Sequence, residues 1–136
     1  MALIQRPGDG ALLVSEGTNP AGASFHRPLG GHVEFGEYAR DTVRRELREE
    51  IGQELTAVRL ASVVENIFQW DDATQHEIVF LFIAAFADPA AYEIAEQAIL
   101  DSRRRTRVIW RAPDAASPPL YPAGVAEATA QAGAAS

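Results

Sequence analysis

One stretch of sequence, residues 39–52, constrains the fold of this chain more than any other. Val43, Leu47 and Ile51 recur every four residues, a spacing that places them on one face of an α-helix. Gly52 follows directly, and glycine is the common residue just after the end of a helix. The sequence therefore predicts a helix over residues 39–51 that buries an apolar stripe against the rest of the protein.

The same helix carries three glutamates on a second face. At about 100° per residue, Glu46, Glu49 and Glu50 fall within an arc of roughly 100°. Carboxylates this close repel one another, so the cluster needs a compensating charge. Mg²⁺ provides one, because it prefers oxygen ligands and often bridges carboxylates to substrate phosphates. The alternative is a solvated face of a charged helix with Glu–Arg pairs, the usual role of such charge runs.

Composition narrows the class of protein. The chain has 136 residues, enough for one domain with a real core. It has no cysteine, which excludes disulfides, thiolate zinc sites and cysteine nucleophiles and makes a cytoplasmic protein the simplest expectation. All twelve basic residues are arginine, which excludes Schiff-base chemistry and the lysine of phosphate-binding loops. The net charge of −7 argues against a nucleic-acid polymer as partner, and no apolar run is long enough for a membrane span.

Runs rich in Val, Ile, Leu and Phe predict strands around the helix. The predicted strands are residues 2–5, 11–16, 55–68, 77–87 and 106–111, with a polar turn at 69–75. Strands 55–68 and 77–87 are expected to be buried, because they are the richest in these apolar residues. We expect a loop at Gly17–Pro28 and a loop or short helix at Asp88–Leu100. This mixture predicts an α/β or α+β domain over residues 1–122. The alanine-rich tail, residues 123–136, is expected to be a frayed helix or disordered.

Residues in front of the helix extend its pattern into a longer motif. The motif begins with a glycine, followed after five residues by a glutamate and after seven more by Arg-Glu-hydrophobic-any-Glu-Glu-any-Gly. The matching residues in this chain are Gly31, Glu37, Arg45, Glu46, Leu47, Glu49, Glu50 and Gly52. This pattern resembles the MutT-like box of the Nudix hydrolase superfamily, with Gln53 departing from its final hydrophobic position. Eight matched positions across 22 residues are far more specific than a lone glycine motif. The resemblance implies an α/β/α sandwich with a mixed sheet and a loop–helix–loop motif.

The resemblance also implies roles for the residues of the box. Glu46, Glu49 and Glu50 match the family's ligands for Mg²⁺ or Mn²⁺, and the main-chain carbonyl of Gly30 often joins them. Arg45 and Glu37 match orienting or structural residues, and Gly31 and Gly52 complete the structural motif.

A further acidic ligand or general base commonly follows the long central strand in this family. By order and spacing Glu96 or Glu93 matches it, and a surface glutamate is the alternative for each. Glu77 is another candidate, although its place at a strand start suits a structural role equally well. Glu46 and Glu96 compete for the role of base, and the sequence does not separate them.

The implied activity is a Mg²⁺-dependent pyrophosphohydrolase. Such an enzyme cleaves a nucleoside diphosphate linked to another group, as in a nucleoside triphosphate or nucleotide sugar, by attack of water on phosphorus. The alternative is a catalytically silent Nudix domain that binds a nucleotide or a protein. Silent members commonly lose a glutamate of the box, whereas this chain keeps all of them. Homodimers are common in the family, so a homodimer is a further expectation.

Residues outside the box are candidates for substrate binding. Phe68 and Trp70 can stack on a base, with packing at the core or rim as the alternative. Arg27 precedes a Leu-Gly-Gly segment where the family usually has Pro-Gly-Gly, in the loop expected to face the substrate. The basic cluster of Arg103–Arg107 can bind a terminal phosphate or form a solvated loop.

Overall fold

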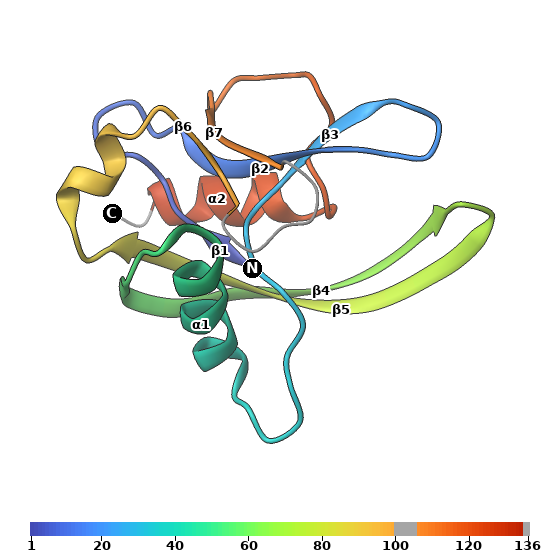
Figure 1. Ribbon diagram of the computed structural model, residues 1–136, viewed down its shortest axis with the longest axis horizontal. Coiled ribbons are helices and arrows are strands. Elements are labelled where there is room, and N and C mark those ends of the chain that lie inside the picture. Colours follow the sequence, from blue (N-terminus) through green and yellow to red (C-terminus); the bar gives the residue numbers. More distant parts are fainter. Residues whose placement is uncertain (100–105, 135–136) are drawn as a thin grey trace.

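The computed structural model describes residues 1–99 and 106–134, which form strands, two α-helices and one 3₁₀ helix (Figure 1). In chain order the elements are β1 (Ala2–Leu3), β2 (Leu12–Thr18), β3 (Ser24–Arg27), α1 (Ala39–Ile51), β4 (Leu55–Trp70), β5 (Ala73–Phe86), η1 (Pro89–Glu93), β6 (Glu96–Ala98), β7 (Arg107–Arg111) and α2 (Val125–Ala134). No helix among these described residues is long and apolar enough to cross a membrane.

The strands form two sheets. The first has the order β1-β5-β4 and is mixed, because β1 runs parallel to β5 and β4 runs antiparallel to it. The second has the order β3-β2-β7-β6, and its neighbouring strands are antiparallel. The predicted α+β class with a mixed sheet is confirmed.

Strand β5 separates two halves of the hydrophobic core. Phe82 and Phe86 belong to one buried cluster, together with Leu47 of α1. Leu81 belongs to another, together with Val125 of α2. Alternate residues of a strand point to opposite faces of its sheet. The mixed sheet therefore lies between α1 and α2, which is the expected α/β/α arrangement (Figure 1).

Helix α1 has the predicted bounds, and its end explains why. Gly52 has a φ of 70°, a left-handed conformation that glycine adopts without steric cost. Its N–H donates to the carbonyl oxygens of Arg48 and Leu47, so the last turn of the helix is closed. Val43, Leu47 and Ile51 are buried, as their spacing predicts.

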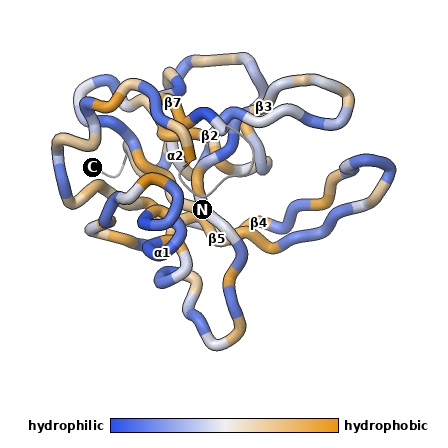
Figure 2. The backbone as a smooth tube through the Cα atoms, viewed as in Figure 1, coloured by the Kyte–Doolittle hydropathy of each residue, from blue (hydrophilic) through white to orange (hydrophobic). Residues whose placement is uncertain are grey.

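The hairpin β4–β5 is longer than predicted and projects from the rest of the molecule (Figure 1). Strand β4 ends at Trp70 and strand β5 begins at Ala73. The turn between them consists of Asp71 and Asp72, both at positive φ. The prediction of buried strands is wrong for the outer half, where Ile67 is 61% exposed. Figure 2 shows the end of this hairpin as largely hydrophilic. In the outer half of the hairpin, the apolar residues reflect the preference of such residues for strands. Only near the helices does the apolar composition also reflect burial.

Two loop predictions are corrected by the structure. Residues 17–28 contain strand β3, which pairs with β2 across a turn where Asn19 Oδ1 accepts a hydrogen bond from the Ala23 N–H. The turn residues dominate the composition of this segment and conceal the four-residue strand behind them. The segment Asp88–Leu100 is predicted to be a loop or a short helix. It contains the short helix η1, which agrees with the second alternative, and also strand β6.

The alanine-rich C-terminal segment is an ordered part of the fold over residues 125–134. It forms α2, in which Val125 and Ala128 are buried in the cluster around Leu81. A helix is one of the two alternatives predicted for this tail, and packing against the mixed sheet stabilises it beyond its local propensity. The proposed domain boundary at residue 122 stays a prediction.

We expect Val125→Ala to lower the free energy of unfolding by about 2 kcal/mol, because it leaves a cavity between α2 and the sheet. Urea denaturation followed by circular dichroism measures this change. Glu127→Ala, at an exposed position of the same helix, should change stability by less than about 0.5 kcal/mol. Equal stability of the two variants would contradict the packing of α2.

Candidate active site

Arg45 holds together the acidic groups around helix α1. Its guanidinium donates to Glu37 Oε2 at 2.9 Å, to Glu46 Oε1 at 2.9 Å and to Glu49 Oε2 at 3.1 Å. It also donates to the main-chain carbonyl of His32 at 3.3 Å. The hydrogen bond with Glu37 and the other carboxylates raise the pKa of Arg45. One arginine thus joins the loop before α1 to two of the three glutamates on the helix.

Glu37 is held by several donors at once. Thr42 Oγ1 donates to its Oε1 at 2.6 Å, and the Glu34 N–H donates to the same atom at 3.3 Å. Arg45, and then Thr42, lower the pKa of Glu37 to about 2. Glu37 is therefore an ionised structural partner of Arg45, which agrees with the structural role that its position in the motif implies.

Glu50 differs from the other two glutamates of the helix. Its Oε2 atom is buried and has no hydrogen-bond partner among the residues that the structure describes. Burial, and then the negative charge of Glu46, raise the pKa of Glu50 to about 7, against the effects of Arg27 and the Gly30 N–H. A buried carboxylate oxygen without a donor is costly. Glu50 therefore requires a proton or a cation beside it.

Gly31 brings the preceding loop into contact with helix α1. A Cβ atom at this position would collide with the carboxylate of Glu46. Any larger residue at this position would therefore displace the Glu46 carboxylate. The glycine of the motif is thus explained by its contact with one of the candidate metal ligands.

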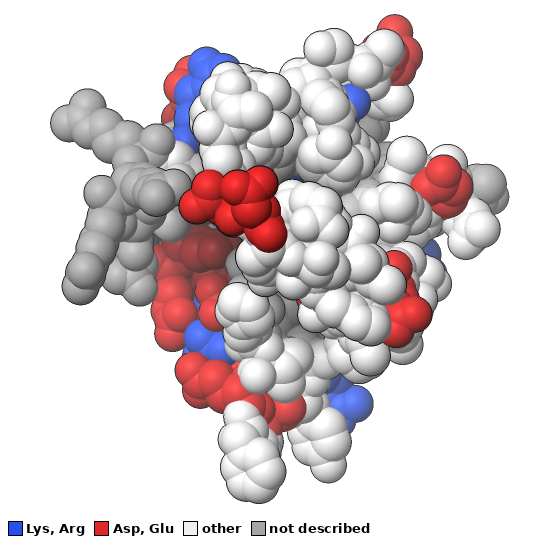
Figure 3. All heavy atoms as spheres, turned by 90° about the vertical axis from the view of Figure 1, so that its right-hand side faces the viewer, with Lys and Arg blue, Asp and Glu red and all other residues white. Residues whose placement is uncertain are grey.

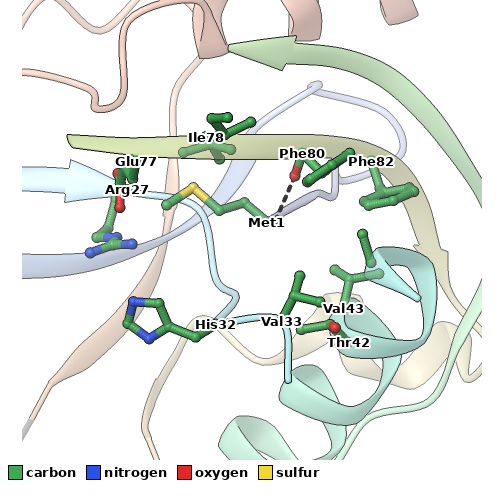
Figure 4. A pocket seen from close by; sticks show the side chains of 13 residues that line it. Met1, Arg27, His32, Val33, Thr42, Val43, Glu77, Ile78, Phe80 and Phe82 are labelled. Atoms are coloured by element: carbon green, nitrogen blue, oxygen red, sulfur yellow. Dashed lines mark hydrogen bonds between the residues drawn. The ribbon is translucent and has the colours of Figure 1, made fainter. Parts of the chain in front are cut away.

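A pocket lies beside these groups, between the first half of α1 and strand β5 (Figure 4). Its lining includes Arg27, His32, Val33, Glu77 and Phe80. Arg27 and Glu77 lie toward one end of the pocket, and Val33 and Phe80 lie toward the other (Figure 4). The pocket therefore has a charged end and an apolar end.

The pKa of the Met1 amino group depends on the charged groups around this pocket. It donates to the Phe80 carbonyl at 2.8 Å. Burial, and then Arg27, lower its pKa to about 6, while Glu50, Glu46 and Glu77 act in the opposite direction. Glu77 lines this pocket, and its Oε1 accepts a hydrogen bond from Asn66 at 3.0 Å. Among the acidic candidates outside the box, Glu77 is therefore the one that lies at the pocket.

The other acidic candidates lie elsewhere. Glu96 is on β6, where its side chain is 55% exposed and lies 3.6 Å from Arg107 Nε. Glu93 is the last residue of η1. Neither residue contacts the box glutamates in the described parts of the chain. Over residues 1–99 and 106–134, no three His, Asp or Glu side chains lie close enough together to form a ready metal site.

The predicted substrate-binding residues are placed on two elements. Trp70, at the end of β4, packs edge-on against Phe25 with ring centroids 5.9 Å apart, and Phe68 lies two residues before it on the same strand. The sequence prediction misses Phe25 because it treats this segment as a loop, and the four residues Ser24–Arg27 carry no strong strand pattern. Of the arginine cluster, Arg107 pairs with Glu16, and residues 103–105 lie outside the described residues.

Comparison with known proteins identifies the family. A family model described as the NUDIX domain matches residues 1–131. The chain belongs to the Nudix family. The solution structure of the E. coli ORF135 protein is similar, with a TM-score of 0.62 and 26% identity over 98% of this chain and 88% of that one. A MutT NUDIX hydrolase from Burkholderia pseudomallei has the same fold, with a TM-score of 0.66 and 23% identity over 96% and 94% of the two chains.

The expected fold and the assignment as a Nudix hydrolase are thus confirmed in general. Nudix hydrolases generally use a divalent metal, and the donor chemistry of this box suits one, although its glutamates are not gathered into a ready three-ligand group among the described residues. Glu46, Glu49 and Glu50 provide hard oxygen donors, and the buried Oε2 of Glu50 lacks a partner among the described residues. Figure 3 shows acidic side chains gathered on one face of this Nudix hydrolase among its described residues.

The pairing of Glu37 with Arg45 predicts a pH-dependent contribution to stability. Because the folded-state pKa is lowered from 4.5 to about 2, this contribution is fully present above about pH 4.5 and is lost as the pH falls toward 2. Glu37→Gln should therefore be less stable than the wild type at pH 6, and the difference should shrink between pH 5 and pH 3. Urea denaturation at each pH measures it.

Glu127→Gln is the matched control, because it makes the same chemical change on the exposed side of α2. Its stability should follow that of the wild type at every pH. A Glu37→Gln variant that also follows the wild type from pH 6 to pH 3 would contradict the proposed ion pair.

Proposed function

We propose that this Nudix hydrolase cleaves a nucleoside diphosphate linked to another group, such as a nucleoside triphosphate or a nucleotide sugar. Mg²⁺ is the proposed cofactor, with Mn²⁺ as a substitute, and water attacks phosphorus. The observation that carries the proposal is the buried Glu50 carboxylate, whose Oε2 has no partner among the described residues, beside Glu46 on the same helix. A divalent cation is the partner that such a carboxylate pair favours.

The proposed ligands are Glu46, Glu49 and Glu50, with the Gly30 carbonyl. When bound, magnesium neutralises phosphate oxygens and acidifies the attacking water. Arg45 positions Glu46 and Glu49 through direct hydrogen bonds, and it keeps the loop before α1 against the helix. Arg27 lines the pocket and carries the positive charge that phosphate oxygens bind.

For the general base we propose Glu77 ahead of Glu96, Glu93 and Glu46. Glu77 lines the pocket and acts on the same amino group as Glu46 and Glu50. Glu46 accepts a hydrogen bond from Arg45 and is itself a proposed metal ligand, so its carboxylate already has two other roles. Glu96 faces Arg107 at the edge of the second sheet. A base must reach the attacking water directly or through one further water, and the position of Glu77 supports this best.

A silent nucleotide-binding or protein-binding Nudix domain is the second candidate. The observation in its favour is that Arg45 engages Glu46 and Glu49, and that no ready three-ligand group occurs among the described residues. A nucleotide would then bind without hydrolysis. The cytoplasmic location and the homodimer also remain proposals, the first from the cysteine-free composition.

We expect Glu50→Gln and Glu49→Gln each to lower kcat by about 100-fold or more, because each removes a charged oxygen at the site of phosphate chemistry. A screen of nucleoside triphosphates, nucleotide sugars, ADP-ribose and dinucleoside polyphosphates with Mg²⁺ provides the substrate. The control is Glu54→Gln, just beyond the same helix, where the glutamate pairs with exposed Arg48. It should keep wild-type turnover.

Chelation gives an independent check of the metal. EDTA should abolish hydrolysis, and added Mg²⁺ or Mn²⁺ should restore it. Unchanged turnover in both glutamate variants, or full activity in EDTA, would overturn the proposed metal-dependent mechanism. Nucleotide binding without hydrolysis of any compound in the screen would support the silent domain instead.

A further inference from the structure

Three aromatic side chains meet at the end of the β4–β5 hairpin. Phe25 of β3 lies 5.9 Å from Trp70 and 6.0 Å from Tyr121, measured between ring centroids. Trp70 is 36% exposed and Tyr121 is 51% exposed. We call Phe25, Trp70 and Tyr121 the aromatic patch. Its rings contact one another but leave part of their surface open to a ligand.

Strand β3 connects the aromatic patch to the pocket. Phe25 and Arg27 are two residues apart on this strand, so their side chains lie on the same face. Arg27 lines the charged end of the pocket (Figure 4) and acts on the carboxylate of Glu50. Along this face of β3, Arg27 at the charged end of the pocket is therefore followed by the aromatic patch.

Strand β4 makes the same connection from the other side. Asn66 is paired with Glu77, a lining residue of the pocket, and Trp70 lies four residues further along the strand. At about 3.3 Å per residue this spans roughly 13 Å. Phe68 lies between Asn66 and Trp70 on this strand, at the same two-residue spacing that places side chains on one face. This length suits a ligand with phosphates at one end and a flat ring at the other.

The aromatic patch is held in place by buried polar groups. Arg111 is buried and donates to the carbonyl oxygens of Ala115 and Pro118, which fixes the loop that leads to Tyr121. It also contacts His26 Nδ1 at 3.0 Å, and the His26 carbonyl accepts a hydrogen bond from the Tyr121 N–H at 2.8 Å. Tyr121 is thus tied to the strand that carries Phe25, so the patch is formed before a ligand arrives.

We propose that the aromatic patch binds the nucleobase of the substrate, with the phosphates extending past Arg27 to the glutamates of α1. This inference rests on the proposed function and adds to it the three residues that hold the base. A planar base gains stacking energy on aromatic rings whatever its hydrogen-bonding pattern. A sugar or an inorganic phosphate chain gains none.

The hydrolysis test compares two substrates that differ only in the base. They are the best nucleoside triphosphate of the screen and ribose 5-triphosphate. Trp70→Leu and Tyr121→Leu should each raise KM for the nucleoside triphosphate roughly tenfold with little change in kcat, because one stacking contact contributes about that factor. Neither substitution should change KM for ribose 5-triphosphate.

The matched control lies in the second aromatic cluster of the molecule. There Trp110 packs against Tyr92 and Phe86 at comparable distances, 6.0 and 6.4 Å. Trp110→Leu should leave the ratio of the two KM values at its wild-type level. The proposal is overturned if Trp70→Leu affects both substrates equally, or if Trp110→Leu changes the ratio as much.

A binding measurement separates this proposal from the hydrolytic one. The chain has two tryptophans, so Trp110→Phe leaves Trp70 as the single reporter. Titration with AMP, GMP, CMP and UMP should quench its fluorescence in a saturable way, and ribose 5-phosphate should not. Quenching without hydrolysis of any triphosphate would refute the hydrolase and support the base site. No quenching by any of the four nucleotides would refute the base site.

Discussion

The site of this protein depends on the bonds between Arg45 and the carboxylates around it. Glu37, Glu46 and Glu49 all accept hydrogen bonds from one guanidinium, and a planar fork of donors suits that task as a lysine would not. Without a positive charge there, the loop before α1 and the acidic face of the helix would repel each other. Glu50 lies outside this network and keeps a buried oxygen that no described residue satisfies. Arg45 therefore stabilises the loop before α1 and the acidic face of the helix. Glu50, which Arg45 does not contact, still needs a positive charge beside it, and this is where a metal is proposed.

Strand β5 connects that site to the rest of the fold. Its inner half is buried on both faces, and its outer half runs into the exposed hairpin. The transition occurs at Glu77 and Phe80, which also line the pocket. The proposed active site is therefore where a buried strand reaches solvent, so that a charged substrate could approach while the helix behind it stays fixed by the core. The outer hairpin brings Trp70 to Phe25 of β3, the contact on which the proposed base binding depends.

Prediction from the sequence succeeded where contacts are local and failed where they are distant. Helix α1 was predicted with its bounds because Val43, Leu47, Ile51 and Gly52 lie within a few turns of each other. Strand β3 was missed because its four residues have no strong pattern and depend on pairing with β2. Helix α2 was underestimated because its alanine-rich sequence gives little amphipathic signal, and its stability comes from the sheet that it covers.

The sequence by itself indicated the chemistry proposed for the protein, through a family motif and three glutamates on one helix face. These features follow from helical geometry, which places residues three and four apart on the same side whatever the remainder of the chain does. Only the tertiary structure decided which distant residues join them. Glu77 rather than Glu96 lies at the pocket, and Phe25 and Tyr121 meet Trp70. Such neighbours are set by strand pairing and sheet packing across tens of residues, and no local periodicity encodes them.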